Sequence, residues 1–184
     1  MAFTVIYDAC VLYPAPLRDL LIRLGTTGLF RARWTNQILD EVFRNIIANR
    51  PDLDEEKLAR TRELMNKAVR DVLVENYEDL IDGLSLPDPD DRHVLAAAIR
   101  CDAQVIVTWN MKDFPAEKLT PYNVEAQDPD EFVLNVMDLK PTAVSQAIER
   151  QAASLKNPPC STDDILDLLE RQGLAQSVAM LRGI

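Results

Sequence analysis

The chain of 184 residues lacks several features that would assign it to a special class of protein. No apolar run approaches the roughly 20 residues that a membrane-spanning helix needs. The first residues show neither a basic segment nor a long apolar one, so we expect no signal peptide. There are three cysteines, an odd number without metal-type spacing, which favours reduced thiols and a cytoplasmic location. Repeats and low-complexity segments are absent as well, and the composition is typical of a globular protein.

Basic residues are also scarce, and the net charge is −10. This balance alone argues against a nucleic-acid partner, because basic surface drives phosphate binding. However, the charge is unevenly distributed: residues 1–50 carry six arginines and four acids, whereas residues 51–140 carry ten basic residues and 21 acids. Bound divalent cations would cancel part of the central excess. An acidic metal site can therefore still meet a polyanion, with arginines contacting the phosphates.

Hydrophobic patterning predicts an alternation of strands and helices in the first three quarters of the chain. Strands are expected at residues 3–7, 29–34, 105–107 and 123–126, with a further short one near 72–74. Helices are expected at residues 17–25, 36–47, 52–72, 77–82, 91–100, 128–137, 143–155, 161–172 and 174–181. We therefore predict an α/β domain over residues 1–138 and a helical extension over residues 139–184.

Acidic side chains occur where these elements begin and end. Asp8 closes the first strand, and three aspartates stand at the start of an alanine-rich helix that precedes the strand 105–107. If the two strands are parallel neighbours, their carboxyl ends and the amino end of that helix share one edge of the sheet. The candidate side chains at this edge are Asp8, Glu41, Asp88, Asp90, Asp91, Thr108, Asn110 and Asp113.

Four or five carboxylates in one site raise each other's pKa and require a compensating charge. Divalent cations that prefer hard oxygen ligands usually provide it, and Mg²⁺ or Mn²⁺ suit carboxylates and water. A pair of such ions can hold and hydrolyse a phosphodiester.

Each of these residues also has a purely structural interpretation. Asp88-Pro89-Asp90-Asp91 is a favourable helix start, with a cap, a proline and two acids at the positive end of the dipole. Glu41 falls on the polar side of its helix, and Asn110 and Asp113 both favour turns. His93, the single histidine, is expected to pack or cap rather than act as a base.

Four segments together resemble the PIN-domain ribonucleases, and among them the VapC-type toxins of bacterial toxin–antitoxin systems. The segments are V-I-Y-D-A-C-V-L, T-N-Q-I-L-D-E-V-F-R-N-I, P-D-P-D-D-R-H-V-L-A-A-A-I and V-I-V-T-W-N-M-K-D-F-P, and the resemblance covers roughly residues 3–137. The helical tail with K-N-P-P is similar to an extension found in one branch of these toxins.

This resemblance implies a three-layer α/β/α fold with a central, mostly parallel sheet. It implies an endoribonuclease that uses Mg²⁺ or Mn²⁺ and leaves a 5′-phosphate and a 3′-hydroxyl. It also implies a homodimer and an antitoxin protein, one segment of which enters the acidic site.

Position by position, the resemblance assigns catalytic and metal-binding roles to the acids. Asp8, Glu41 and an acid at the helix start match metal ligands, the last being Asp91 or Asp90, with Asp88 as a possible additional acid. The fourth position falls on Asn110 or Asp113, and the acid Asp113 is preferred. Thr108, with Asn110, matches residues that position a phosphate or a water.

Two other functions remain open at this point. A phosphatase or phosphoacceptor protein could use Asp8 as its nucleophile, but the expected D-x-D-x-T/V motif is missing, since Ala9 and Cys10 follow. Alternatively, the chain could be an interaction module that keeps the fold with weakened catalysis, in line with the neutral Asn110 and the net charge of −10.

Overall fold

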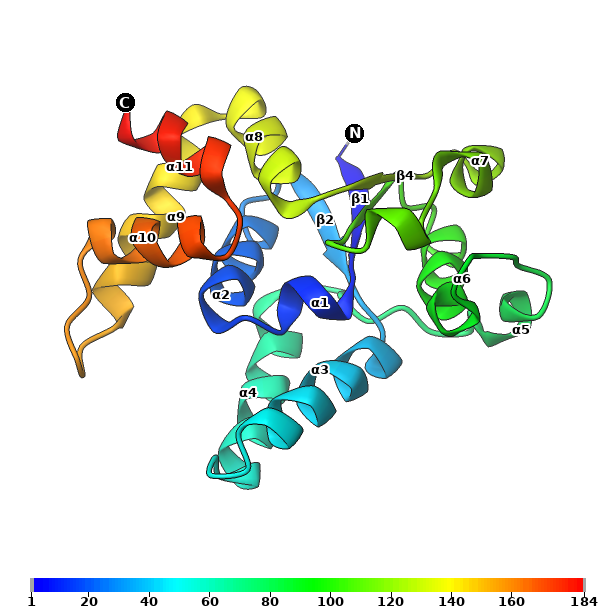
Figure 1. Cartoon of the computed structure of the whole chain (residues 1–184), viewed down its shortest axis with the longest axis horizontal. Helices are drawn as coiled ribbons and strands as arrows, with labels where there is room; N and C mark the ends of the chain where they lie inside the picture. Colours follow the sequence, from blue (N-terminus) through cyan, green and yellow to red (C-terminus); the bar gives the residue numbers. More distant parts are fainter. Residues whose placement is uncertain (1, 184) are drawn as a thin grey trace.

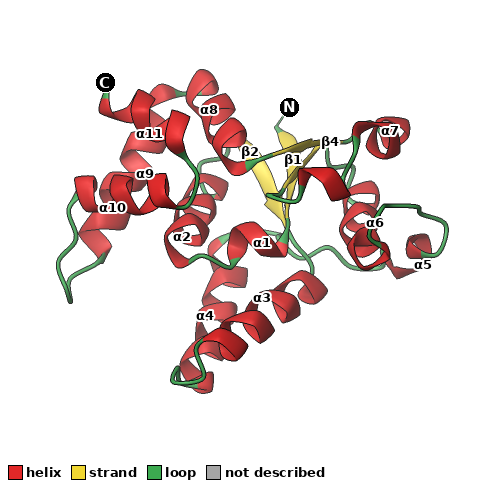
Figure 2. Ribbon diagram, in the orientation of Figure 1, coloured by secondary structure: helices red, strands yellow, loops and turns green. Residues whose placement is uncertain are grey.

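The computed structural model describes residues 2–183 and contains a four-stranded parallel sheet (Figures 1 and 2). The strands are β1 (Phe3–Tyr7), β2 (Phe30–Arg33), β3 (Val105–Val107) and β4 (Glu125–Gln127), in the order β2-β1-β3-β4. All three pairings are parallel, with Val5 opposite both Ala32 and Val105. The structure confirms the predicted α/β class. It also confirms that strand 105–107 lies beside the first strand.

Helices account for most of the remaining chain. They are α1 (Ala9–Leu12), α2 (Ala15–Gly25), α3 (Asn36–Asn49), α4 (Glu55–Ala68), α5 (Glu78–Ile81), α6 (Arg92–Arg100), α7 (Ala116–Leu119), α8 (Pro129–Leu139), α9 (Pro141–Ser154), α10 (Thr162–Arg171) and α11 (Ala175–Arg182). Short 3-10 helices cover Pro89–Asp91, Met111–Asp113 and Thr120–Tyr122.

The order of the strands creates a switch point between β1 and β3. From β1 the chain crosses to β2 in one direction, and from β2 it returns past β1 to β3. Because parallel crossovers are right-handed, the connections in opposite directions place their helices on opposite faces of the sheet. Accordingly α2 packs on β2, whereas α6 packs on β1 and β3 from the other side (Figure 2). Ligands of such sheets bind beyond the strand ends at the switch point.

The helix predicted over residues 52–72 is shorter in the structure. The apolar pattern suggested a helix through Val72, but α4 ends at Ala68, and Leu64, expected on its buried face, is 53% exposed. Val72 belongs to an extended segment that hydrogen-bonds to Trp34, whose backbone N–H donates to the Val72 carbonyl at 3.0 Å. This pairing with Trp34 is an isolated bridge at Leu73 rather than a fifth strand. Ile47, also expected to be buried, is 36% exposed.

An aromatic cluster holds the middle of the sheet in place. The ring of Tyr7 contacts those of Phe30, Trp34 and Phe132, with centroid distances of 6.4, 6.4 and 6.0 Å. All four side chains are buried, and the Tyr7 hydroxyl donates to the carbonyl of Leu21 at 3.0 Å. Since Tyr7 is the last residue of β1, this packing fixes the strand immediately before Asp8.

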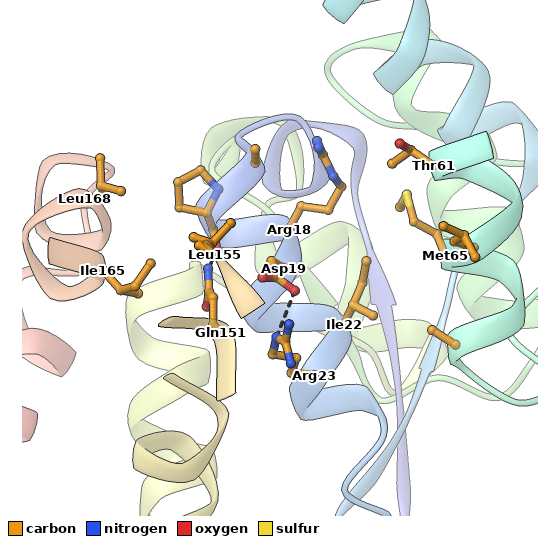
Figure 3. A pocket seen from close by; sticks show the side chains of 14 residues that line it. Arg18, Asp19, Ile22, Arg23, Thr61, Met65, Gln151, Leu155, Ile165 and Leu168 are labelled. Carbon is orange, nitrogen blue, oxygen red and sulfur yellow. Dashed lines mark hydrogen bonds and ion pairs between the residues drawn. The ribbon is translucent and has the colours of Figure 1, made fainter. Parts of the chain in front are cut away.

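The C-terminal helices pack together beside α2 and α8 (Figure 1). The buried side chain of Gln151 on α9 donates to the carbonyl of Pro16 at 2.9 Å. Between α2, α4, α9 and α10 lies a mainly apolar groove of about 560 Å³, in which Ile165 and Met65 stand on opposite sides of α2 (Figure 3). The C-terminal helices are thus joined to the α/β domain rather than tethered by a linker.

A buried carboxylate ties the last helix to α8. Asp130 Oδ1 accepts hydrogen bonds from the backbone N–H of Ser177 at 2.8 Å and from its hydroxyl at 2.6 Å. Asp130 Oδ2 accepts a third from the backbone N–H of Gln176 at 3.0 Å. The side chain thereby satisfies free N–H groups at the first turn of α11.

No helix within residues 2–183 has the length and apolar composition needed to cross a membrane.

We expect Asp130→Ala to lower the free energy of unfolding by about 2–4 kcal/mol, because the N–H groups of Gln176 and Ser177 lose their acceptor and the Ser177 hydroxyl keeps only the carbonyl of residue 130. Urea denaturation followed by circular dichroism would measure the change. Asp138→Ala, at an exposed position on the same helix, is the matched control and should change stability by no more than about 0.5 kcal/mol. Equal effects of the two substitutions would contradict this account.

Candidate active site

The candidate site lies beyond the ends of β1 and β3, at the switch point. Asp8 follows β1 directly and is 3% exposed. Its Oδ1 accepts the backbone N–H of Ala9 at 2.7 Å, which makes it the cap of α1. Its Oδ2 accepts the hydroxyl of Thr108 at 2.8 Å. Both oxygens of this carboxylate are therefore held in place.

Thr108 connects the two strand ends. It is fully buried, and its backbone N–H donates to the carbonyl of Gln127 at 3.0 Å, which continues the pairing of β3 with β4. Its hydroxyl donates to Asp8 and accepts the backbone N–H of Asn110 at 3.0 Å. Thr108 thus fixes the carboxylate and the start of the following loop at once.

Cys10 takes part in this network, which the sequence analysis did not foresee. Its Sγ lies 3.5 Å from Asp8 Oδ2 and 3.4 Å from the Thr108 hydroxyl, and it accepts the backbone N–H of Trp109 at 3.3 Å. Burial and the negative charge of Asp8 raise the pKa of the thiol to about 12. The thiol therefore stays protonated at neutral pH and can donate to Asp8. Its position two residues after Asp8 was the available signal.

Asp91 shows that several acids converge on one place. Burial raises its pKa to about 7, and the charges of Asp8, Asp88, Asp113 and Glu41 act in the same direction. These residues come from β1, the segment before α6, the loop after β3, and α3. The structure therefore brings together acids that are far apart in the sequence, at the edge where they were expected.

Glu41 on α3 belongs to the same electrostatic neighbourhood. Its pKa is raised by burial and by Asp8, and less strongly by Asp90 and Asp88, while the positive charge of Arg44 lowers it. A shallow cavity of about 260 Å³ lies beside it, lined also by Cys10, Tyr13 and Asn45. Glu41 is thus half-buried between the other acids and a small cavity, not merely solvated on a polar helix face.

The aspartates at the helix start divide into two kinds. Asp88 caps the 3-10 helix Pro89–Asp91, since its Oδ1 accepts the backbone N–H of Asp90 at 2.9 Å. Asp88 and Asp90 are exposed, and both contribute their charge to the site from its rim. Asp91 is half-buried. The capping interpretation thus holds for Asp88, and Asp91 is the acid of this group that faces inward.

The loop after β3 places Asp113 where its charge acts on Asp91. The segment Met111–Asp113 forms a 3-10 turn in which the Asp113 N–H donates to the carbonyl of Asn110 at 2.9 Å. The charge of Asp113 acts on Asp91, whereas the Asn110 side chain is exposed. The turn-forming role expected of this segment is therefore present together with an acid at the site.

His93 is buried in the first turn of α6, as the packing interpretation predicted. Its Nδ1 has no hydrogen-bond partner among the residues described, and burial lowers its pKa. The imidazole is therefore neutral at pH 7.

Most arginines of residues 1–50 are engaged in structural contacts, so the expectation that they serve RNA as a group is not supported. Arg18 donates to the carbonyls of Leu12 and Tyr13, and Arg33 to those of Val72 and Leu73. Arg23 pairs with Asp19 and Arg50 with Asp52. Arg44 is the arginine whose charge acts on Glu41, and it is exposed.

The donor chemistry fits a hard divalent cation, although the side chains are not arranged in coordination geometry. Within residues 2–183 no three or more His, Cys, Asp or Glu side chains come close enough to hold a metal ion. The acids nevertheless raise one another's pKa, and carboxylates that share a site in this way are the ligands that Mg²⁺ and Mn²⁺ prefer. Asp8, Glu41 and Asp113 are acids whose charges act on Asp91.

Comparison with known families assigns the class of this fold. The family model described as "PIN domain" matches residues 4–112, which is more than half of the chain. The chain therefore belongs to the PIN domain family. A second model, described as "VapC50 C-terminal domain", matches residues 129–183.

Among individual proteins, the chain is similar to "Putative ribonuclease VapC50" of Mycobacterium tuberculosis, with 42% identity over 96 residues. The match covers 52% of this chain and 56% of that protein, so it spans about half the length of the curated relative. No solved structure matches the chain.

We expect Asp91→Asn to stabilise the metal-free protein in a pH-dependent way. Folded Asp91 keeps its proton up to about pH 7, whereas an unfolded aspartate loses it near pH 4. Between these values the folded state binds more protons, so the wild type loses stability as the pH rises. The gain in melting temperature from Asp91→Asn should be absent below about pH 4, grow up to about pH 7 and then remain constant.

Melting curves in a chelator between pH 4 and 8 would test this expectation. Asp138→Asn, which changes an exposed acid on α8, is the control and should show no such trend. A gain that is the same at every pH would show that the raised pKa of Asp91, caused by burial and by the neighbouring acids, is not its cause.

Proposed function

We propose that the chain is a metal-dependent endoribonuclease that hydrolyses RNA phosphodiester bonds, and the toxin of a toxin–antitoxin pair. The observation that carries this proposal is the convergence of acids from four segments on Asp91, at the switch point of a PIN fold. Membership of the family and the similarity to a protein named as a ribonuclease support the reaction class.

In this proposal Asp8, Glu41, Asp91 and Asp113 hold Mg²⁺ or Mn²⁺, and Asp90 assists from the rim. A bound ion would supply Lewis-acid stabilisation of the phosphodiester and a lowered pKa for water. Of the two candidates for the fourth position, we assign it to Asp113, because its charge acts on Asp91. Asp88 serves as a helix cap and an additional negative charge.

Thr108 orients the site rather than binding substrate itself. Its hydroxyl donates to Asp8 Oδ2 and accepts from the backbone of Asn110, so it holds the carboxylate in one orientation. The exposed amide of Asn110 is free to meet a phosphate or a water at the mouth of the site. Arg44, beside Glu41, is suited to contact the RNA backbone as it enters.

The proposal extends to partners, organisation and location. We infer a cytoplasmic protein in which residues 1–138 form the nuclease domain and residues 139–184 the extension. An antitoxin protein would inhibit it through a segment that reaches the acidic edge, and a homodimer is the expected assembly. The match to the model described as "VapC50 C-terminal domain" and the similarity to the protein named VapC50 support the pairing with an antitoxin.

We expect Asp8→Asn to reduce Mg²⁺- or Mn²⁺-dependent RNA cleavage by about 100-fold or more, since it removes a negatively charged ligand that would hold the metal ion. Cleavage of a fluorescent RNA under single-turnover conditions would measure the rate. Glu149→Gln, an exposed acid on α9, should cleave at the wild-type rate. Undiminished cleavage by both Asp8→Asn and Asp91→Asn would refute the assignment of the site.

The two alternatives receive less support from the geometry. A phosphoacceptor needs an accessible carboxylate, but Asp8 is 3% exposed and both its oxygens already accept hydrogen bonds. A non-catalytic interaction module would bind neither ion, and a calorimetric titration with millimolar Mn²⁺ separates it from the nuclease.

A further inference from the structure

Trp109 occupies a position between the candidate site and the C-terminal extension. Its neighbours in the chain are Thr108 and Asn110, which are hydrogen-bonded to each other and, through Thr108, to Asp8. Its indole ring, partly buried, lies against the turn that joins α10 and α11. A residue of the active-site loop therefore touches the extension directly.

The contact on the extension side is made by Gly173. A Cβ added to this glycine would lie 2.7 Å from Cη2 of Trp109, and 3.3 and 3.4 Å from Cζ2 and Cζ3. Real Cβ atoms essentially never come within 3.0 Å of such an atom, so a side chain at Gly173 would force either the ring or the turn to shift. In Figure 1 this turn, coloured orange to red, lies on the side of the extension that faces the sheet.

Gly173 also has a local structural role, which accounts for the glycine but not for the tryptophan. Its φ of +109° ends α10. Its N–H donates to the carbonyl of Glu170, and the Leu174 N–H donates to that of Leu169. This is the Schellman arrangement that often closes a helix, and it fixes the turn in one conformation. Any apolar residue could have covered such a turn.

The helices on both sides of the turn are anchored to the α/β domain. Ile165 of α10 is fully buried in the region where α10 contacts α2. The start of α11 is held by the buried carboxylate of Asp130, two residues into α8. Since α8 follows β4, and β4 pairs with β3, the turn has a fixed position relative to the strand end that carries Thr108.

The backbone of Trp109 is hydrogen-bonded to the group that contacts Asp8. The Trp109 N–H donates to Cys10 Sγ at 3.3 Å, and this sulfur lies 3.5 Å from Asp8 Oδ2. A shift of the Trp109 backbone would displace this N–H and the neighbouring N–H of Asn110. The loop that carries Asp113 begins at the same point.

We propose that Trp109 is a positioning residue of the active site, clamped by the α10–α11 turn at Gly173, so that the extension holds the loop of Thr108–Asp113 in its working position. The expected effect on RNA cleavage rests on the proposed nuclease function. The proposed restraint on the loop does not depend on that function. The extension thereby acts as a structural part of the site rather than as a separate module.

The test uses two glycines with positive φ. Gly173→Ala introduces both backbone strain and a clash with Trp109, whereas Gly28→Ala (φ +79°, nothing within 4 Å of the added Cβ) introduces strain alone. We expect Gly173→Ala to lower the single-turnover cleavage rate by about 10- to 100-fold with little change in RNA affinity. Gly28→Ala should cleave RNA at the wild-type rate.

A rescue variant and a second readout make the test specific. In Trp109→Phe/Gly173→Ala the smaller ring leaves space for the new Cβ, so the cleavage rate should rise above that of Gly173→Ala alone. Amide hydrogen exchange of Trp109 and Asn110 reports the loop without any cleavage assay. Exchange should accelerate in Gly173→Ala and in Trp109→Leu, which leaves the turn's backbone unchanged, but not in Gly28→Ala.

The outcomes are distinguishable. Unchanged exchange at the amides of residues 109 and 110 in folded Trp109→Leu would overturn the proposal, as would wild-type cleavage by Gly173→Ala. If Gly173→Ala does not fold, the hydrogen exchange of Trp109→Leu alone decides whether the proposal holds. If the wild type cleaves no RNA, the proposed function fails, and the exchange rates still decide whether the extension clamps the loop.

Discussion

The hydrogen bond from the Thr108 hydroxyl to Asp8 joins the ends of β1 and β3, and the rest of the site depends on it. It spans 2.8 Å between two buried groups that are 100 residues apart in the chain. A buried carboxylate is stable only when its oxygens are hydrogen-bonded. This bond, with the N–H of Ala9, meets that requirement and fixes the direction in which Asp8 presents its charge.

Around this bond, carboxylates of like charge raise one another's pKa. Asp91 is buried, and the charges of Asp8, Asp88, Asp113 and Glu41 all act on it, so its ionised form costs stability in the absence of a cation. The fold withstands this loss of stability because the surrounding core is tightly packed. The ring of Tyr7, just before Asp8, packs against three other aromatic rings. Repulsion held in place by a rigid core is typical of sites that are stabilised by their ligand.

The C-terminal extension contributes to the same rigidity. Its helices are anchored by Asp130 and by the packing of α9 and α10 on α2, and its Gly173 turn supports Trp109 beside the acids. The site is therefore bounded by three parts of the chain: the strand ends, the start of α6 and the extension. In our proposal the C-terminal helices thereby support the candidate site.

The sequence by itself determined the strands and the helix starts, because these follow from local patterns. Short apolar runs rich in β-branched residues marked β1 and β3, and Asp88-Pro89 marked a helix start. Local pattern failed at α4, whose apolar residues continue into an extended segment paired with Trp34. Only the tertiary structure decided that Asp91 is half-buried near other acids, that Cys10 bonds within the site, and that Gly173 meets Trp109. These depend on contacts between distant segments, which no local spacing encodes.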